Sequence, residues 1–553
     1  MKFNKTKSTL SLAAAMMVSS VHAQGSALEL EPTYYNDFGF KNIAFFSAIG
    51  GSSHYTWVLS ISDELGKRGH NVTYLTNDKD VKFGKPYKHV KTVSIGPPVD
   101  YTPEEITSEF LRDIDTVDFM TMAFGFIHKH FERDYEFTRD YFIANNIDLA
   151  LCDHFAEACV EAATSLNIPY IVTSAMEITK DSAAPYINNN IVTLTTPTSE
   201  FQSFVSRFEN KFIKPIKMIR KLMPFFKQLN ERKKSIGIDA KIQDPSTKWQ
   251  NALKLVNNIH GFSPARPMGP LVELVGPIIP KQYAPLNEPL EQFLSTHKRV
   301  AYVAFGQTAT PSEADIKLIM TTLLECIERD ILDSFLWATV NAAGNLPDTI
   351  TTSSGTVYHT QAMINHTNPH ARFVSWAPQT AVLLHPSTAL FVSHGGLGSW
   401  YESLYAGKRM MMFPFFGDQP VNALIIEQSN YGGIFKHDFT MEQAIGLVKR
   451  LMEDKDGKIK SALERGKALV QTRSKNSVIR GADAVEEVAY THNNGILEHR
   501  ISADRRMSYI KAHNLDLYGA FIALVGTVLY VVVFVSFRIV SYLKPSQIKL
   551  KTQ

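Results

Sequence analysis

The hydrophobic residues of this 553-residue chain occur in short apolar runs that alternate with longer stretches of helical periodicity. In the first half, apolar runs rich in β-branched and aromatic residues predict strands at 42–49, 71–76, 148–152 and 169–173. Between them, apolar residues spaced by three and four predict helices at 53–68 and 156–166. This alternation is typical of a parallel sheet, because a parallel connection crosses over through a helix.

The alternation restarts after a proline-rich stretch, 263–280, which predicts an interdomain linker. Further strands are predicted at 299–305, 334–340, 371–376, 388–393 and 409–415, with a helix at 313–328. We therefore expect an α/β fold of two doubly wound, Rossmann-like domains that face each other across a cleft, with ligands at the carboxyl ends of the strands. The predicted parts are a first domain at 40–262, a second domain at 281–475 and C-terminal helices at 476–516.

Both ends of the chain carry targeting patterns. Residues 1–23 begin with lysines, continue through the apolar run LSLAAAMMV and end in Val-His-Ala, which is typical of a cleaved secretory signal peptide. Residues 517–537 hold no charged residue over 21 positions. At about 1.5 Å per residue this length crosses a hydrocarbon core of about 30 Å. We expect one transmembrane helix, with a buried core helix as the alternative.

The signal peptide decides the predicted orientation, because basic residues flank the span on both sides. The bulk of the chain is then lumenal, and residues 538–553 form a basic cytosolic tail. The tail ends in KLKTQ, which resembles the dilysine signal of resident endoplasmic-reticulum membrane proteins; a plain stop-transfer flank is the alternative. We expect a single-pass protein of the endoplasmic-reticulum membrane.

Charge and cysteine content narrow the class of protein. The formal net charge of +3 supplies no global field of the kind that nucleic-acid proteins carry, so no nucleic-acid partner is expected. Three cysteines, Cys152, Cys159 and Cys326, are an odd and sparse set. They argue against a disulfide framework and against a four-ligand zinc site, so we expect stability to come from packing.

The stretch 391–402, FVSHGGLGSWYE, runs from a predicted strand through a histidine and glycines into a predicted helix. Ser399 and Glu402 have the spacing of a capping box, so we expect Ser399 to cap that helix. Gly395, Gly396 and Gly398 let backbone N–H groups approach a ligand closely. Such a helix start favours a phosphate, and His394 adds a hydrogen-bond donor. The alternative is a tight turn in which the glycines serve only the backbone.

Residues 376–419 (WAPQTAVLLHPSTALFVSHGGLGSWYESLYAGKRMMMFPFFGDQ) closely resemble the signature of UDP-glycosyltransferases. The stretch contains W-x-P-Q, H-G-G, a glutamate eight residues after the histidine, and Asp-Gln at the family's spacings. The organisation of nearly the whole chain resembles that of the membrane-anchored glucuronosyltransferases of the endoplasmic reticulum. The resemblance implies the two-domain GT-B fold, with the acceptor bound by the first domain and the UDP-sugar by the second.

The resemblance also implies roles for individual side chains. Trp376 stacks on uracil, Gln379 and Glu402 hydrogen-bond the nucleoside, with Glu402 on the ribose, and His394 with the following amides holds the diphosphate. Asp418 and Gln419 contact the sugar hydroxyls. Each role suits its side chain: an indole face for a base, a carboxylate for a diol and planar polar groups for a sugar. The alternatives are a core position for Trp376 and a turn position for Asp418.

The chain departs from the family pattern at two donor-site positions. Gly398 replaces the asparagine of H-G-G-x-N, and Gln307 replaces the serine that follows Phe-Gly at the end of the first strand of the second domain. Gly306 and Gln307 remain expected donor-site residues, with Ser399 and Gln307 as substitutes for the missing contacts.

The acceptor chemistry is expected on the first domain, where the first strand is followed by IGGSSH, ending at His54. A histidine with a pKa near 6.5 at the cleft can take the proton of an acceptor hydroxyl. In the related enzymes an aspartate at the end of a later strand orients this histidine, and Asp153 has the corresponding place. The alternatives are a capping or surface role for His54 and a helix N-cap role for Asp153.

The predicted reaction is transfer of a hexose, from UDP-glucose or UDP-glucuronate, to a hydroxyl of a lipophilic acceptor or lipid, with inversion. Neither a metal nor a cofactor beyond the UDP-sugar is expected. Asp113-Ile-Asp115 resembles the D-x-D motif of metal-dependent transferases, but it lies in a charged helical stretch and does not follow a strand, so we expect it to be a solvated face. The alternative is a silent relative that binds a nucleotide sugar or lipid. An oxidoreductase is disfavoured because no strand is followed by G-x-G-x-x-G. An oligomer is possible.

The segment 201–234 carries ten Lys or Arg against two acids, together with aromatic and aliphatic residues at spacings of three and four. This pattern predicts an amphipathic helix. It could lie on a membrane surface. A core-facing helix with a basic outer face is the alternative.

Overall fold

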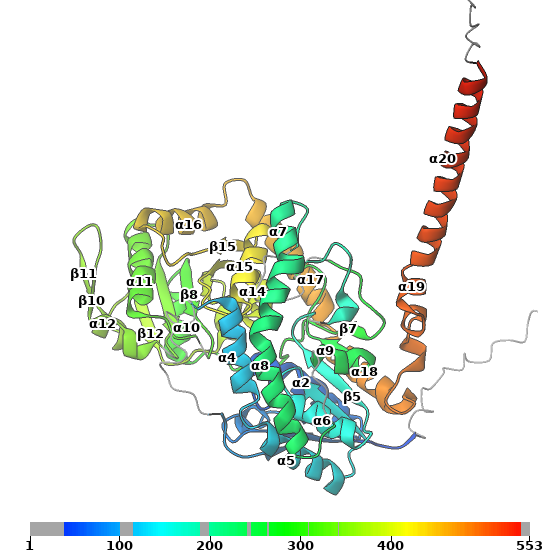
Figure 1. The fold of residues 1–553 in the computed structure, drawn as a ribbon. Coiled ribbons are helices and arrows are strands. Elements are labelled where there is room, and N and C mark those ends of the chain that lie inside the picture. The colour runs from blue at the N-terminus through cyan, green and yellow to red at the C-terminus, as the bar shows by residue number, and fades with distance from the viewer. Residues whose placement is uncertain are drawn as a thin grey trace, which may run out of the picture. The chain divides into compact units, whose positions relative to one another are not determined.

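The computed structural model describes residues 38–99, 114–177, 179–188, 198–239, 245–262, 265–307, 309–340 and 342–543 (Figure 1). The predicted signal peptide, Asp113 and the tail beyond residue 543 lie outside these residues.

The first sheet has seven strands in the order β3-β2-β1-β4-β5-β6-β7, and its neighbouring strands are parallel. The strands are β1 (Asn42–Phe46), β2 (Asn71–Thr76), β3 (Val90–Ser94), β4 (Leu149–Asp153), β5 (Tyr170–Ser174), β6 (Leu253–Val256) and β7 (Val272–Leu274). Strand β7 lies inside the stretch predicted as a linker, so the first domain extends beyond residue 262. The sequence pattern did not predict this strand, because the strand pairs with β6 over only three residues and lies in a proline-rich stretch.

Helices cover both faces of the first sheet. Along β1, Ile43 and Phe45 point to one face, whose core is shared with α2 (Ser52–Lys67) and α18 (Ser477–Thr491). Ala44 and Phe46 point to the other face and pack with α5 (Phe131–Ala144) and α6 (Glu157–Ser165). The alternation follows from the two-residue period of a strand. Further helical elements are α4 (Thr116–Ile127), α7 (Phe204–Phe208), the π-helical turn η5 (Glu209–Ile213), α8 (Lys214–Ser235) and α9 (Pro245–Lys248).

The second sheet has six parallel strands in the order β12-β9-β8-β13-β14-β15. They are β8 (Val300–Ala304), β9 (Ser334–Ala338), β12 (Ala371–Val374), β13 (Thr388–Ser393), β14 (Arg409–Met412) and β15 (Gly432–Ile434); β10 (Thr349–Thr351) and β11 (Val357–His359) form an antiparallel pair. The helices are α10 (Glu288–Ser295), α11 (Glu313–Glu328), α12 (Thr360–Ile364), α13 (Gln379–Leu384), α14 (Leu397–Ala406), α15 (Gln419–Gln428), α16 (Met441–Glu453) and α17 (Lys458–Ser474). The expected pair of doubly wound domains is therefore present.

Two connections join the domains. The chain returns to the first domain after α17, where α18 packs on α2 and Arg68 donates to Asp483 at 2.7 Å. The hydroxyl of Tyr401, in α14, donates to the Asn257 carbonyl at 2.7 Å. Phe262 stacks beside Tyr401 with ring centroids 5.0 Å apart. These contacts hold the helix that begins after the H-G-G turn against the carboxyl end of β6.

Within the described residues, one helix is long and apolar enough to cross a membrane. Helix α20 (Leu515–Leu543) includes the predicted span and has a mean hydropathy of 2.6 over its apolar window. None of its residues is buried, so the core of either domain does not depend on it. The prediction of a span in preference to a buried core helix agrees with this exposure.

Cys152 and Cys159 form a disulfide, which the sequence analysis did not predict. Cys152 is the next-to-last residue of β4 and Cys159 lies in the first turn of α6, with Cα atoms 5.7 Å apart. The odd number of cysteines concealed the pair, because the third, Cys326, is buried in α11. The bond closes the turn that contains Asp153.

Candidate functional site

His54 and Asp153 meet at the carboxyl edge of the first sheet. His54 lies in the first turn of α2, directly after the loop that follows β1, and Asp153 is the last residue of β4. Strands β1 and β4 are neighbours, so their ends lie side by side. His54 Nδ1 is 3.0 Å from Asp153 Oδ2, and the Asp153 side chain is 3% exposed. The predicted pair is therefore assembled in the structure.

Asp153 has a second hydrogen bond that fixes its carboxylate. Its Oδ1 accepts from the backbone N–H of Phe155 at 3.0 Å, ahead of helix α6. The N-cap residue of α6 is Ala156, so Asp153 is not the cap; it stabilises the turn before the helix. One oxygen is held by the backbone while the other faces His54.

His154 was missed by the sequence analysis, although it follows Asp153 directly. Its ring stacks on that of His54, with centroids 5.1 Å apart and planes 16° apart. His154 Nδ1 lies 3.6 Å from Asp153 Oδ2. This ring nitrogen has no hydrogen-bond partner among the residues that the structure describes. The ligand atoms of these three side chains lie within 4.8 Å of one another, so the group could also hold a metal ion.

Burial and neighbouring charges shift the pKa of His54 in opposite directions. Burial lowers the pKa of His54, but the Asp153 carboxylate, helped by Asp418, outweighs it, so the pKa lies above 6.5. Burial alone would raise the pKa of Asp153, yet the two histidines hold it below its usual range. Asp153 is therefore an anion at neutral pH and strengthens His54 as a base.

Asp418 brings the second domain into this site. It stands before α15, and its Oδ2 accepts from Asn422 Nδ2 at 2.8 Å. Burial raises its pKa above 3.8, opposed by Asn422 and His54. Asp418 and His54 shift each other's pKa, so the residue predicted to contact the sugar lies within electrostatic range of the residue predicted to act as the base. Gln419 has a structural role: its Oε1 accepts hydrogen bonds from the backbone N–H groups of Phe415 and Phe416, in the turn before α15.

His394 directly follows β13, and its ring lies between two glycines. A Cβ on Gly396 would be 2.4 Å from His394 Nε2, and a Cβ on Gly306 would be 3.0 Å from its Cε1. These glycines thus make room for the imidazole, a different role from the close approach to a ligand that the sequence suggested. Burial lowers the pKa of His394 to about 4, so the ring is neutral near pH 7 and can donate a hydrogen bond without carrying charge.

The prediction that Ser399 caps the following helix is wrong. Helix α14 begins at Leu397, and its N-cap, Gly396, offers no side chain. Ser399 lies within the first turn and accepts from Gln379 Nε2 at 3.1 Å. The N–H groups at the start of α14 lack a side-chain cap, which suits an anionic ligand. Gly395, with φ of +91°, makes the preceding turn.

Glu402 is bound to the start of α13. Gln379 Nε2 and Thr380 Oγ1 both donate to its carboxylate, the latter at 2.8 Å. Burial raises the pKa of Glu402 above 4.5, although both donors oppose the shift. Trp376 is 61% exposed, which excludes a core position and leaves its indole open to a ligand.

Gln307 and Gly398 are the remaining positions of the predicted donor site. Gln307 is exposed in the turn after β8, beside Gly306. Gly398 has no atom within 4 Å of its Cβ position, so the space of the absent asparagine side chain is unfilled by protein atoms within the described part of the chain.

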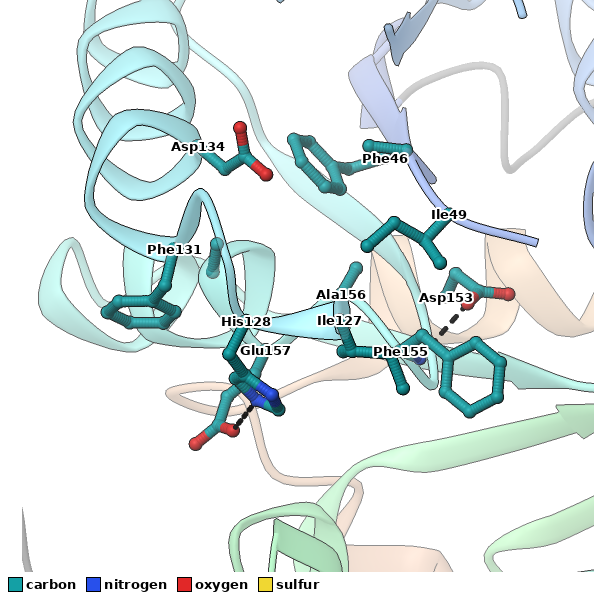
Figure 2. A pocket seen from close by; sticks show the side chains of 12 residues that line it. Phe46, Ile49, Ile127, His128, Phe131, Asp134, Asp153, Phe155, Ala156 and Glu157 are labelled. Carbon is teal, nitrogen blue, oxygen red and sulfur yellow. Dashed lines mark hydrogen bonds and ion pairs between the residues drawn. The ribbon is translucent and has the colours of Figure 1, made fainter. Parts of the chain in front are cut away.

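A narrow pocket adjoins Asp153 on the first domain (Figure 2). Its wall is mainly apolar, with Phe46, Ile49, Ile127, Phe131 and Phe155. At one end His128 Nε2 lies 2.7 Å from Glu157 Oε2. The pocket leaves room for about one water molecule. No motif marks these residues, because they come from three separate segments of the chain, 46–49, 127–134 and 153–158.

The comparisons with known proteins agree with this geometry. The family model described as "UDP-glucoronosyl and UDP-glucosyl transferase" matches residues 47–551. UDP-glycosyltransferase stmC of Aspergillus ustus is 27% identical over 504 residues, covering 85% of this chain and 92% of the relative. UDP-glucuronosyltransferase 2B7 of Homo sapiens is 22% identical over 515 residues, covering 87% and 90%.

Solved structures share the fold at low identity. A UDP-glucosyltransferase from Polygonum tinctorium, described as capable of glucosylating indoxyl, has a TM-score of 0.56 at 16% identity and covers 82% of this chain and 99% of that one. The calicheamicin glycosyltransferase CalG4 has a TM-score of 0.54 at 17% identity and covers 81% and 98%. The two sheets described above are therefore those of a GT-B glycosyltransferase.

Proposed function

Because the chain belongs to the UDP-glucoronosyl and UDP-glucosyl transferase family, and is a UDP-glycosyltransferase that takes its sugar from a UDP-sugar, we propose a narrower reaction. The sugar is glucose or glucuronate, the acceptor is a hydroxyl of a lipophilic molecule or lipid, and the anomeric centre is inverted. No metal takes part. The observation that carries this proposal is the His54–Asp153 pair, with Asp418 of the other domain within electrostatic range of His54.

In the proposed reaction, His54 Nε2 takes the proton of the acceptor hydroxyl as its oxygen attacks the anomeric carbon. The bond from that carbon to the UDP oxygen breaks on the opposite face, so one displacement inverts the centre. Asp153 holds Nδ1–H and stabilises the imidazolium that forms. General-base help of this kind contributes about 10² to 10⁴ in rate.

The second domain holds the leaving group. We assign the diphosphate to the uncapped start of α14 and to neutral His394, the uracil to Trp376 and the ribose to Glu402 with Gln379. Gly306, Gln307 and Ser399 line the same region, and Asp418 and Gln419 serve the sugar hydroxyls. Amide N–H groups and a neutral donor stabilise the developing charge on UDP without a metal ion.

The proposed acceptor class is supported by the pocket beside Asp153, whose wall is mainly aromatic and aliphatic and also carries Asp134 and the polar pair of His128 and Glu157. Apolar walls bind lipophilic molecules, and the polar pair would orient a hydroxyl or carbonyl. The pocket is narrow, so an acceptor has to displace side chains around it.

The proposed location is the endoplasmic-reticulum membrane, with both sheets in the lumen and α20 as the anchor. The predicted signal peptide supports this orientation. The Cys152–Cys159 disulfide also supports it, because disulfides persist in oxidising compartments.

The test is transfer of labelled sugar from UDP-glucose and, separately, UDP-glucuronate into a membrane lipid extract and a phenol mixture. His54→Ala should reduce product by about 10² or more. The exposed His359→Ala, in the hairpin of the second domain, is the matched control and should retain activity. Retained UDP binding without transfer from either donor would favour the silent relative.

A further inference from the structure

The helical segment α7–η5–α8 (Figure 1) exposes a group of large apolar side chains along its first half. Phe201 is 88% exposed and Phe204 72% exposed. The exposed large apolar side chains here are Phe201, Phe204, Val205, Phe208, Phe212, Ile213, Ile216 and Ile219. The alternative of a core-facing helix is therefore excluded for this half of the segment. Apolar side chains gathered in this way require a partner or a lipid phase.

Most of these apolar side chains recur at spacings of three and four residues, which places them along one side of the helix. Phe204, Phe208 and Phe212 form a row of contacts, with ring centroids 6.1 and 5.1 Å apart. The positions between them carry basic side chains, namely Arg207, Lys211, Lys214, Lys217, Arg220 and Lys221. Glu209 is the single acid between residues 201 and 221.

The other half of α8 holds the segment on the first domain. Leu222 and Leu229 are buried, and Lys233 Nζ donates to Glu161 at 2.9 Å. Phe226 packs edge-on against Phe124 of α4, with centroids 5.6 Å apart. The exposed half is thus a continuation of an anchored helix, and its exposure is a property of the folded domain.

We propose that residues 201–221 lie on an anionic lipid surface, with the apolar row in the boundary between head groups and acyl chains. An apolar row flanked by cations is the pattern of helices that lie in the membrane interface. Among the six basic side chains, Lys221 is ion-paired with Asp118 of α4. A hydrophobic protein partner would account for the row alone, whereas a lipid surface with phosphate head groups accounts for both the row and the other five cations.

The segment also touches the wall of the pocket beside Asp153. The ring of Phe225, in α8, lies 5.4 Å from that of His128, which lines the pocket. Lipid docking would therefore hold the pocket near the bilayer, where lipophilic acceptors dissolve. This consequence rests on the proposed function; the docking itself does not.

The first test uses the full chain, labelled with an environment-sensitive fluorophore on an introduced cysteine. Native thiols do not compete, because Cys152 and Cys159 are joined and Cys326 is buried. The probe is placed at Phe212→Cys or, as the matched control, at Gln228→Cys, an exposed position of α8 outside the proposed contact, and the protein is reconstituted into phosphatidylcholine–phosphatidylserine vesicles containing brominated lipid. Stronger quenching at 212 than at 228 is expected. Equal quenching, or signals that depend on protein density as for a second copy, would overturn the proposal.

The second test removes the anchor. A chain ending at Asn514 loses α20, of which no residue is buried, and residues 544–553. It should float with anionic vesicles, and Phe204→Ser, Phe208→Ser, Phe212→Ser and Ile216→Ser together should abolish flotation. Lys217→Gln and Arg220→Gln should each weaken binding about fivefold. Val357→Ser with Ile364→Ser, exposed apolar residues of the second domain, should have no effect. Absence of flotation with anionic vesicles would refute the proposal.

Discussion

His54 Nδ1 and Asp153 Oδ2 lie 3.0 Å apart although 99 residues separate them along the chain. The contact exists because β1 and β4 are neighbours in a parallel sheet and end at the same edge. The geometry of this proposed catalytic pair is therefore a property of strand order, and we expect both residues to be sensitive to conservative substitution.

Asp153→Asn should reduce kcat by about 10² to 10⁴ while leaving the KM for the UDP-sugar nearly unchanged. An amide cannot stabilise the imidazolium and can favour the wrong tautomer of His54. Steady-state kinetics with varied donor measure both constants. Asp140→Asn, an exposed aspartate of α5, is the control; an unchanged kcat in Asp153→Asn would contradict the assigned role.

The pH dependence of kcat/KM should show a rising limb with a midpoint above 6.5. The base acts when His54 is neutral, and its pKa is raised, so activity is lost as pH falls through that raised value. In Asp153→Asn the attraction is gone while burial still lowers the pKa, so the midpoint of the residual activity should move to lower pH. Rate profiles of both proteins between about pH 5 and 9, on both sides of the ordinary histidine value of about 6.5, decide this.

Gly396→Ala should weaken UDP binding by about tenfold or more, because its methyl group would meet His394 Nε2 at 2.4 Å and displace the ring. Gly446→Ala, at an exposed position of α16 in the same domain, is the matched control, since its added carbon also meets no neighbouring side chain within 4 Å. Isothermal titration with UDP compares the two variants. Similar losses in both would show that the position of His394 is not what matters.

Trp376→Ala should reduce UDP affinity by about 1 to 3 kcal/mol, the value of stacking one base on an aromatic ring. Its side chain is 61% exposed, so the thermal stability of the protein should change little. Separate titrations of the protein with UDP and with pyrophosphate, which lacks the uridine, distinguish recognition of the base from recognition of the phosphates. Equal loss for both ligands would argue against stacking.

Replacing Cys152 and Cys159 together by alanine should lower stability by about 2 to 3 kcal/mol, the loop-closure contribution of a short disulfide loop. Activity should fall as well, because the bond closes the turn that carries Asp153. Thermal inactivation and transfer rates, with Cys326→Ala as the single-thiol control, test both statements. Full activity in the double variant would show that the turn holds its shape unaided.

Several features were predictable because they depend on neighbouring residues in the sequence. The strand and helix periods, the apolar run that became α20, and the donor-site candidates between Trp376 and Gln419 are all local patterns. Five of the eleven proposed donor-site residues, from His394 to Glu402, come together because one strand–turn–helix unit, β13–α14, carries them. The capping prediction for Ser399 failed within the same unit, because α14 begins at Leu397 and the sequence does not show at which residue a helix starts.

Other features depend on which elements pack together, and this is decided by contacts between distant residues. The sequence alone determined an α/β chain with two repeating halves, an apolar C-terminal helix and a donor motif. Only the tertiary structure placed β7 in the first sheet, returned α18 to α2, paired Cys152 with Cys159, set His154 against His54 and exposed the aromatic row of α7 and α8. Periodicity shows that a face is apolar, whereas burial of that face depends on whether another part of the fold covers it.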